Sequence, residues 1–182
     1  MRFIETYKKS IMPTLAKDLG IKNIHALPYV ERVVVNVGLG RMSQKPSFSD
    51  KILPEIIEQV ASICGQRPSN RAAKKSIAGF KLREGQVIGL AATLRGARMY
   101  DLIEKIVGIA YPRVRDFRGI SLKNIDKAGN LNLGFRDQVV FPEINMDTSS
   151  VDFGLQITLV CKAKSREDAI ELYKKLGFRF KK

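Results

Sequence analysis

The sequence predicts an α+β domain in which helices pack on one face of a β-sheet and the other face stays open. Three observations support this fold class: strand-like segments, helix-like segments with one apolar stripe each, and a long basic stretch between two of them. The 182 residues, 45% of them hydrophobic, suffice for a sizeable core. No linker or internal repeat divides the chain, so we expect a single domain over residues 1–182.

The N-terminal part of the chain predicts helices followed by a strand. Apolar residues recur at helical spacing over residues 2–19, but Pro13 interrupts the run, so we expect two short helices, the second beginning near Pro13. Residues 30–37 read VERVVVNV, and this β-branched run predicts a strand that ends at the GLG of residues 38–40. A polar loop is expected over residues 41–48.

The next helix is expected over residues 49–64, where isoleucine and valine side chains share one face. Pro54 falls in its first turn, where proline is tolerated, and Gly65 is a natural C-terminal stop. The basic stretch follows at residues 67–85, RPSNRAAKKSIAGFKLREG. Short strand pieces are expected around residues 66–69 and 76–82, with a loop tip between them. The stretch holds one acidic residue, Glu84, against Arg67, Arg71, Lys74, Lys75, Lys81 and Arg83.

Alternation and helical spacing continue after the basic stretch. Residues 86–95 alternate and predict a strand, and residues 97–110 predict a helix that Pro112 ends. Residues 113–150 are irregular, with short strand pieces possible at 131–137.

The last two elements are a strand and a helix. Residues 153–162, FGLQITLVCK, alternate and predict the strand. Ser165 with Asp168 resembles a capping box with Asp in the Glu/Gln position, so a helix is expected from there to Gly177, which stops it.

Period-two alternation assigns the strand residues to two faces. One face is apolar, with Val33, Val35, Val37, Ile88, Leu90, Leu94, Leu155, Ile157 and Leu159. The open face then presents Arg32, Asn36, Thr93, Arg95, Gln156, Thr158 and Lys162. Two interpretations remain for the open face: a solvated surface, or an RNA-docking surface where amide and hydroxyl groups meet 2′-hydroxyls and base edges while cations meet phosphates.

Charge narrows the choice of partner. The chain has 32 Lys+Arg against 18 Asp+Glu, a net charge of +14 and a pI near 10.0, which in a folded domain suggests nucleic acid. A membrane surface is disfavoured, because no apolar run approaches about 18 residues and no basic amphipathic helix dominates. The first ten residues lack the apolar region of a secretory signal.

Catalytic and metal-binding patterns are absent from the sequence. His25 is the only histidine, and Cys64 and Cys161 form no CxxC, so we expect buried, reduced thiols and a cytoplasmic location. No nucleophile elbow, HExxH or Walker motif occurs, and the GLG of residues 38–40 is not a dinucleotide fingerprint. We therefore expect no enzyme activity, no cofactor and no metal site.

Two basic segments each allow two interpretations. RAAKKS (71–76) is either a solvated loop or a phosphate-binding loop, whose small residues would let its backbone approach a partner. In RVRDFR (113–118), Phe117 is either buried among solvated arginines, the interpretation we favour, or a stacking ring among phosphate binders.

Collinear motifs from about residue 3 to the C-terminus resemble the bacterial form of large-subunit ribosomal protein five, the 5S-ribosomal-RNA-binding family. They are VVVNVGLG (33–40), GQRP (65–68), RAAKKSIAGFKLREGQ (71–86), TLRGARMYDLIEK (93–105), PRVRDFRG (112–119), NLNLGFRDQVVFPEI (130–144) and LGF (176–178). The resemblance implies an antiparallel sheet with helices on one side and long excursions. It also implies a place in the central protuberance of the large subunit, bound to 5S rRNA.

By motif match, the resemblance assigns the 5S rRNA contact to Asn36, Gln66 and Thr93, and we add Arg32 and Arg95 from the open face. It assigns a contact with the P-site tRNA to the basic loop, through Arg71, Lys74, Lys75 and Ser76. It further implies a bridge from residues 108–146 to a small-subunit head protein, with 23S rRNA and other central-protuberance proteins nearby. The loop has Asn70-Arg71-Ala72-Ala73 where the family commonly has Thr-Arg-Ala. The alternative function is a free-standing RNA-binding or RNA-chaperone module.

Overall fold

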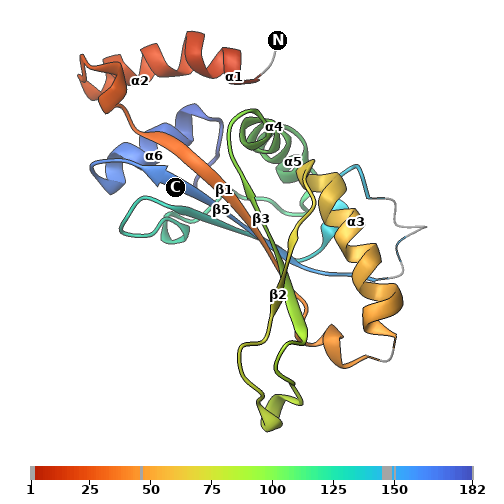
Figure 1. The fold of residues 1–182 in the computed structure, drawn as a ribbon. Coiled ribbons are helices and arrows are strands. Elements are labelled where there is room, and N and C mark those ends of the chain that lie inside the picture. Colours follow the sequence, from red (N-terminus) through yellow and green to blue (C-terminus); the bar gives the residue numbers. More distant parts are fainter. Residues whose placement is uncertain (1–2, 46, 145–148, 150, 182) are drawn as a thin grey trace. The chain divides into compact units, whose positions relative to one another are not determined.

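The structure, a computed structural model, describes residues 3–45, 47–144, 149 and 151–181 (Figure 1). Its five strands form one antiparallel sheet in the order β2-β3-β1-β5-β4, which confirms the predicted α+β class. The strands are β1 (Tyr29–Gly38), β2 (Ser69–Ala72), β3 (Val87–Leu94), β4 (Leu131–Phe135) and β5 (Leu155–Lys162). The helices are α1 (Phe3–Thr6), α2 (Met12–Leu19), α3 (Leu53–Cys64), α4 (Ala97–Lys105), α5 (Tyr111–Arg113) and α6 (Arg166–Lys175).

The chain folds into two compact units. The first unit consists of Met1–Val33, Arg95–Leu133 and Thr158–Lys182, and the second consists of Val34–Leu94 and Gly134–Ile157. Three strands, β1, β4 and β5, contribute residues to both units. The expected single domain over residues 1–182 stays a prediction.

Three prolines lie inside helical runs, and each follows a π-helical turn by two residues. Pro13, Pro54 and Pro112 occupy the first turn of α2, α3 and α5. The turns before them are Tyr7–Ile11, Phe48–Ile52 and Ile106–Ala110, each closed by a bond from residue i+5 to residue i. Because proline has no N–H and its ring clashes with the carbonyl four residues earlier, the wider turn lets the helical backbone continue through it.

These turns revise two predicted boundaries. The backbone is helical without interruption from Phe3 to Leu19, where two separate helices were expected. The helix predicted to end at Pro112 continues to Arg113, and Val114 then adopts an extended conformation. Pro13 therefore does not separate two helices, whereas the run that contains Pro112 ends one residue after it.

The first unit has its core among α2, α4, α6 and the strand segments that belong to it. Leu15, Leu102 and Leu172 are among its fully buried side chains. Tyr173 is also fully buried, and its hydroxyl donates to the carbonyls of Gly129 (2.8 Å) and Leu159 (3.2 Å). This one hydroxyl therefore joins α6 to β5 and to the turn before β4.

The predicted cap of α6 is confirmed. Ser165 is extended, and its hydroxyl accepts from the backbone N–H of Asp168 at 3.1 Å. Gly177 follows the helix with φ 97, a conformation that favours glycine. At the other end of this helix, Lys175 forms an ion pair with Asp18 of α2 at 2.6 Å.

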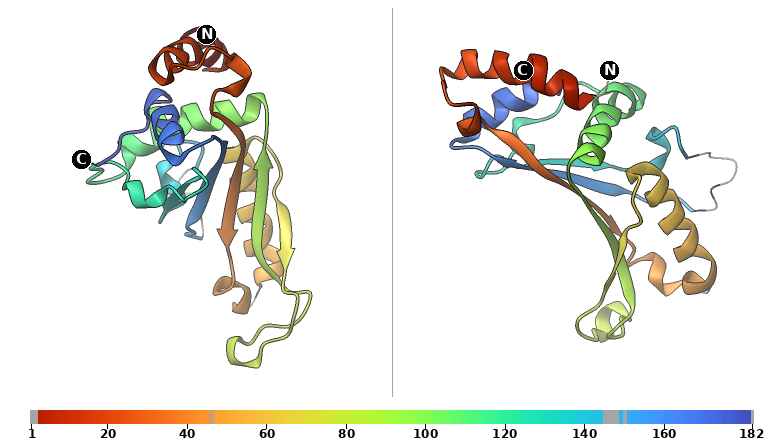
Figure 2. Two further views of the ribbon diagram at one scale, coloured as in Figure 1. Left: turned by 90° about the vertical axis from the view of Figure 1, so that its left-hand side faces the viewer. Right: turned by 45° about the horizontal axis from the view of Figure 1, so that its top comes forward.

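The second unit packs α3 against one face of its sheet residues (Figure 2). The polar side chains of Asn36, Arg71 and Gln156 on these strands are exposed. Ile56, Val60 and Ile63 of α3 are buried, as are the alternate residues Leu90, Ala92 and Leu94 of β3. Gly65 ends α3 in the left-handed conformation, as predicted. The alternation in β1 is also confirmed: Val33, Val35 and Val37 are buried, and Asn36 between them is exposed.

Candidate nucleic-acid interface

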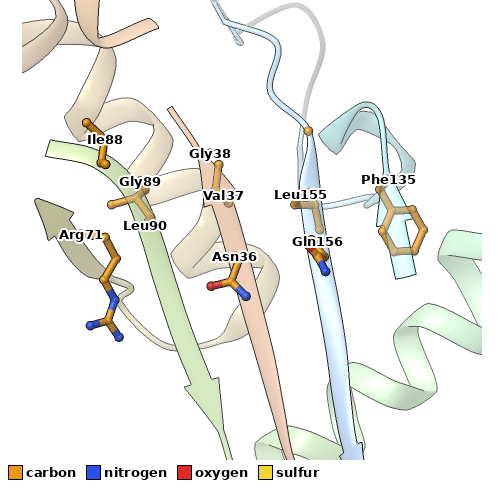
Figure 3. A pocket seen from close by; sticks show the side chains of 11 residues that line it. Asn36, Val37, Gly38, Arg71, Ile88, Gly89, Leu90, Phe135, Leu155 and Gln156 are labelled. Carbon is orange, nitrogen blue, oxygen red and sulfur yellow. The ribbon is translucent and has the colours of Figure 1, made fainter. Parts of the chain in front are cut away.

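A hollow of about 530 Å³ lies on the open sheet face of the second unit, and we call it the sheet-face hollow. Asn36 of β1, Arg71 of β2 and Gln156 of β5 supply its polar side chains (Figure 3). All five strands contribute to the lining, so residues far apart in the sequence meet here. The lining is Asn36, Val37, Gly38, Arg71, Ile88, Gly89, Leu90, Phe135, Gly154, Leu155 and Gln156.

Three glycines belong to the lining of this hollow, and we call them its glycine floor. Gly38, Gly89 and Gly154 come from three different parts of the chain, and all of them line it. A Cβ at Gly89 would lie 2.9 Å from the carbonyl oxygen of Val37, and one at Gly154 would lie 3.1 Å from two carbonyl oxygens. A Cβ at Gly38 would meet no atom within 4 Å. Sheet packing thus explains the first two glycines, whereas it leaves Gly38 unexplained.

The polar side chains of the hollow are exposed to solvent at Asn36, Arg71 and Gln156. Among the described residues, neither the Asn36 amide nor the Arg71 guanidinium has a hydrogen-bond or ion-pair partner. An amide can donate and accept, and a guanidinium can hold a phosphate through two N–H groups. Over a floor rich in glycine, these groups suit close contact with a polar, anionic backbone.

The position of Arg71 differs from the one expected from the sequence. The sequence placed Arg71–Ser76 at the tip of a loop, but Arg71 lies in β2, directly opposite Gly89 of β3. The register shifts by a bulge between Arg71 and Ala72. Because β2 has only four residues, all exposed, it shows no apolar alternation by which to predict it. The glycine inside β3 was an available signal, since a strand glycine often marks close backbone approach.

Gln66 and Thr93 lie together beside the β2–β3 pair. The Gln66 side chain donates to the Thr93 carbonyl at 3.4 Å, and both residues are half-buried. Ser69 makes a similar link, from its hydroxyl to the carbonyl of Ala91 at 2.9 Å. Gln66 therefore supports the sheet, with part of its amide engaged within the protein.

Arg32 and Arg95 belong to the first unit. Arg32 forms an ion pair with Glu31 at 3.3 Å, so part of its charge is already balanced. Arg95 is exposed and follows the last residue of β3. The structure thus gathers Asn36 with Arg71, and Gln66 with Thr93.

The loop between β2 and β3, residues 73–86, forms a folded arm, which we call the basic arm (Figure 1). Ile77 pairs with Leu82, and a 3₁₀ turn, Ala78–Phe80, forms its tip. Lys81 leaves the turn with φ 51. The tip therefore lies several residues beyond the position expected from the sequence.

Side chains hold the basic arm to the Met42–Gln44 turn and hold its two sides together. Gln44 donates to the carbonyl of Phe80 and Gln86 donates to the carbonyl of Ser43, both at 2.8 Å. The Ser76 hydroxyl accepts from the backbone N–H of Glu84 at 2.9 Å. These bonds give the arm defined geometry, in contrast to the flexible loop that the composition suggested.

The surface of the basic arm combines cations with exposed apolar groups. Lys74, Lys75, Lys81 and Arg83 are all exposed. At the tip, 66% of Phe80 and 46% of Ile77 are accessible to solvent. Such a surface can meet phosphates through its cations and an unpaired base or sugar through its apolar groups.

Other site types find no support in the part of the chain that the structure describes. Within these ranges no group of three or more His, Cys, Asp or Glu side chains could hold a metal ion. Likewise, none of the described helices has the length and apolar character needed to span a bilayer. Both cysteines are buried as thiols.

Comparisons with known proteins match nearly the whole chain. A family model described as ribosomal protein L5 matches residues 23–83, and a second model, which describes the C-terminus of the same ribosomal family, matches residues 87–180. Together these matches cover the whole lining of the sheet-face hollow and nearly all of the basic arm.

Individual relatives are similar over the same extent. Large ribosomal subunit protein uL5 of Halothermothrix orenii is 46% identical over 176 residues, 97% of this chain and 96% of that protein. The protein of the same name from Syntrophomonas wolfei is 46% identical over 180 residues, 99% of each chain. That from Geobacter sulfurreducens is 45% identical over 180 residues, 99% of this chain and 98% of that protein.

Proposed function

Because the chain belongs to the ribosomal protein L5 family, we propose that its sheet-face hollow binds 5S rRNA. The chain is a ribosomal protein of the large subunit and acts in translation. Its family is structural and not enzymatic, as the sequence predicted. The predicted family and the predicted location in the large subunit are thereby confirmed.

One observation carries the 5S rRNA proposal: Asn36, Arg71 and Gln156 surround a floor rich in glycine. RNA helices present 2′-hydroxyls and phosphates in a wide, shallow minor groove, and proteins that bind them recognise shape and backbone. The hollow offers amide groups for hydroxyls, a guanidinium for phosphate and a glycine floor that lets the RNA approach. It has no exposed aromatic platform for stacking unpaired bases. We therefore propose a structured, base-paired part of 5S rRNA as its ligand.

The remaining residues assigned from the sequence extend this proposal. Thr93 and Gln66 lie together, and we propose that they contact the RNA next to the hollow. Arg32 and Arg95 add cations in the first unit. The ion pair with Glu31 balances part of the charge of Arg32 and so reduces its attraction for phosphate. The contribution of Arg71 is new: its position in β2 moves it from the proposed tRNA contact to the 5S rRNA contact.

The test is binding of the purified full chain to 5S rRNA, measured by filter binding as a function of salt. Asn36→Ala removes hydrogen bonds worth about 0.5–1.5 kcal/mol, so we expect about 2- to 12-fold weaker binding. Arg71→Gln should also lower the slope of log affinity against log salt by about 0.7–0.9. Asn70→Ala is the matched control, because Asn70 neighbours Arg71 in β2 but does not line the hollow. Equal losses in Asn36→Ala and Asn70→Ala would contradict the assignment.

The basic arm has a separate proposed partner. By its family resemblance we propose that it contacts the P-site tRNA, with Lys74 and Lys75 at phosphates and Ser76 maintaining the arm. The anchored geometry supports a defined contact, because the arm is held by hydrogen bonds from Gln44 and Gln86. Ile77 and Phe80 lie at the tip, so they join the contact.

Further partners follow from the proposed place in the central protuberance. We propose that residues 108–146 form a bridge to a small-subunit head protein. Residues 145 and 146 of this range lie outside the described residues. 23S rRNA and other central-protuberance proteins would lie nearby. Co-sedimentation with large subunits at moderate salt tests this place. A chain that stays in the soluble fraction would favour a free-standing RNA-binding or RNA-chaperone module.

A further inference from the structure

A second hollow, of about 480 Å³, lies in the first unit beside α5, and we call it the aromatic hollow. Three segments form it: the end of the α4–α5 helical run, the turn after it, and the residues following α6. The lining is Val107, Tyr111, Pro112, Val114, Phe117, Gly177 and Arg179. Neither the 5S rRNA proposal nor the tRNA proposal uses this hollow, but Tyr111, Pro112, Val114 and Phe117 fall within residues 108–146, the range proposed above for the bridge to a small-subunit head protein.

Aromatic rings make one wall of the aromatic hollow. Tyr111 and Phe117 are stacked, with ring centroids 4.5 Å apart and planes at 29°. Phe178 meets Tyr111 edge-on, with 6.3 Å between the ring centroids. Both Tyr111 and Phe117 are only half-buried, so their surfaces remain accessible from the hollow. Phe117 thus lies between our two interpretations: it is half-buried against Tyr111, while the neighbouring arginines are exposed as expected.

One cation lines the hollow, and three more are its neighbours in the sequence. Arg179 lines the hollow and is exposed. Arg113, Arg115 and Arg118 alternate with its lining residues along the turn and are exposed as well. Among the described residues, none of the four arginines has an ion-pair partner. Arg179 therefore brings a positive charge to an apolar, aromatic cavity, and three further arginines lie close to the cavity in the sequence.

We propose that the aromatic hollow binds one unstacked nucleobase of RNA, with Arg179 contacting its phosphate. The ligand must be planar and apolar on its faces to match the rings, and anionic to match the arginines. A nucleotide meets both requirements: bases stack on aromatic side chains, and arginine binds phosphate. An acidic protein segment with an aromatic side chain shares this chemistry and would suit the bridge proposed for residues 108–146. We favour RNA because the chain belongs to a ribosomal protein family, and the peptide competition described below distinguishes the two ligands.

This binding mode differs from that of the sheet-face hollow. The sheet-face hollow has a glycine floor and amides, which suit a base-paired backbone. The aromatic hollow has rings and arginines, which suit a base displaced from its helix, in a bulge or a loop. The two hollows also belong to different units of the chain. The experiments below therefore test this proposal independently of the 5S rRNA proposal.

The test uses the full chain and a pentauridylate that carries 4-thiouridine at its centre. Irradiation joins the thio-base to whatever side chain it touches, and mass spectrometry identifies that residue. We expect crosslinks at Tyr111 or Phe117. Phe117→Leu keeps an apolar side chain but removes the ring, so the half-saturation concentration of the crosslink should rise about 5- to 150-fold, the loss of one stacked base.

A second variant leaves the aromatic wall of the hollow unchanged. Arg179→Gln changes an exposed side chain, so we expect the variant to fold as the wild type does. It should lower the slope of log affinity against log salt, measured by the crosslink, by about 0.7. Lys164→Gln is its control, because Lys164 is an exposed cation of the same unit that does not line the hollow. Asn36→Ala should leave the crosslink unchanged.

Three outcomes would overturn the proposal. Crosslinks confined to the sheet-face hollow or the basic arm would show that the base binds elsewhere. Arg179→Gln behaving like Lys164→Gln would exclude a phosphate contact there. An acidic peptide with a central phenylalanine that displaces the pentauridylate at lower concentration than unlabelled pentauridylate would assign the hollow to a protein partner.

Discussion

A Cβ atom on Gly89 of β3 would lie 2.9 Å from the carbonyl oxygen of Val37 in β1. Real Cβ atoms essentially never approach so closely, and a backbone carbonyl inside a sheet has little freedom to move. Glycine at position 89 thus lets the two strands lie at this spacing. Gly38, one residue after Val37, has no such constraint. The two glycines line the same hollow, so comparing them separates folding from binding.

The first prediction concerns this pair. Gly89→Ala forces the Cβ against the Val37 carbonyl, and we expect a loss of about 1–3 kcal/mol in the free energy of unfolding. Gly38→Ala should leave that free energy unchanged or slightly raised, because alanine has less entropy to lose on folding. Urea denaturation of the two variants and the wild type measures both effects.

Gly38→Ala should weaken the binding of 5S rRNA, although it leaves the unfolding free energy unchanged or slightly raised. Its alanine methyl group would project into the sheet-face hollow and hold an RNA backbone away, so affinity should fall although the protein is fully folded. If Gly38→Ala is as stable as wild type and binds 5S rRNA equally well, the hollow is not the contact surface.

The second prediction concerns the buried hydroxyl of Tyr173. Tyr173→Phe leaves the carbonyls of Gly129 and Leu159 without this donor, which should cost about 1–2 kcal/mol of unfolding free energy. Tyr29→Phe is the control, because Tyr29 is 38% exposed and its hydroxyl has no partner among the described residues. Equal stabilities of the two variants in urea would contradict a stabilising role for these bonds.

The third prediction concerns alkaline pH. Burial raises the pKa of the Cys161 thiol from 9.0 to about 12, and the nearby charge of Asp168 adds to the rise. The folded state then keeps a proton that the unfolded chain releases above about pH 9. The contribution to stability is complete below about pH 9 and is lost as the pH rises from there towards about 12. The slope is about 1.4 kcal/mol per pH unit for this one proton.

Tyrosines should steepen this loss above about pH 10. Burial also raises the pKa of Tyr7, Tyr111 and Tyr173 above the ordinary 10.0. Urea unfolding between about pH 7 and pH 11 measures the profile, and Cys161→Ala should remove the decline between about pH 9 and pH 10. An unfolding free energy that stays constant to about pH 10 in the wild type would contradict the prediction.

The fourth prediction separates the basic arm from the sheet. Changing Lys74 and Lys75 to Ala should leave 5S rRNA binding largely intact while weakening tRNA-dependent function. The slope of log tRNA affinity against log salt should fall by about 1.4–1.8, because two phosphate contacts are lost. Phe80→Ala should weaken the same function with little change in that slope, because an apolar contact releases no counterions. Ribosomes carrying each variant provide the measurement, through P-site tRNA affinity at several salt concentrations. A large loss of 5S rRNA affinity in the double lysine variant would reverse the division of roles.

Much of the fold follows from local pattern. The exposed Asn36 between buried Val35 and Val37 was predicted because side chains alternate along a strand whatever its neighbours are. The end of α3 at Gly65 and the cap at Ser165 were predicted for the same reason, since each depends on a few adjacent residues. The helical runs through Pro13 and Pro112 were missed, because a π turn that admits proline has no distinctive composition.

The candidate site was predicted only in part. Asn36 and Gln156 were assigned to the open face from alternation. Arg71 was placed in a loop, because four exposed residues become a strand only by pairing with β3. Phe117 was expected inside the core, yet the turn after α5 leaves it half-buried against Tyr111.

By itself, the sequence determined the type of most elements, the face on which each strand side chain lies, and the family to which the chain belongs. The tertiary structure alone decided that Arg71 lies opposite Gly89, and that Asn36, Arg71 and Gln156 line one hollow. The physical reason is that alternation and capping act between adjacent residues. Strand order and register arise from hydrogen bonds between residues far apart in the chain, and no local pattern records which strands will pair.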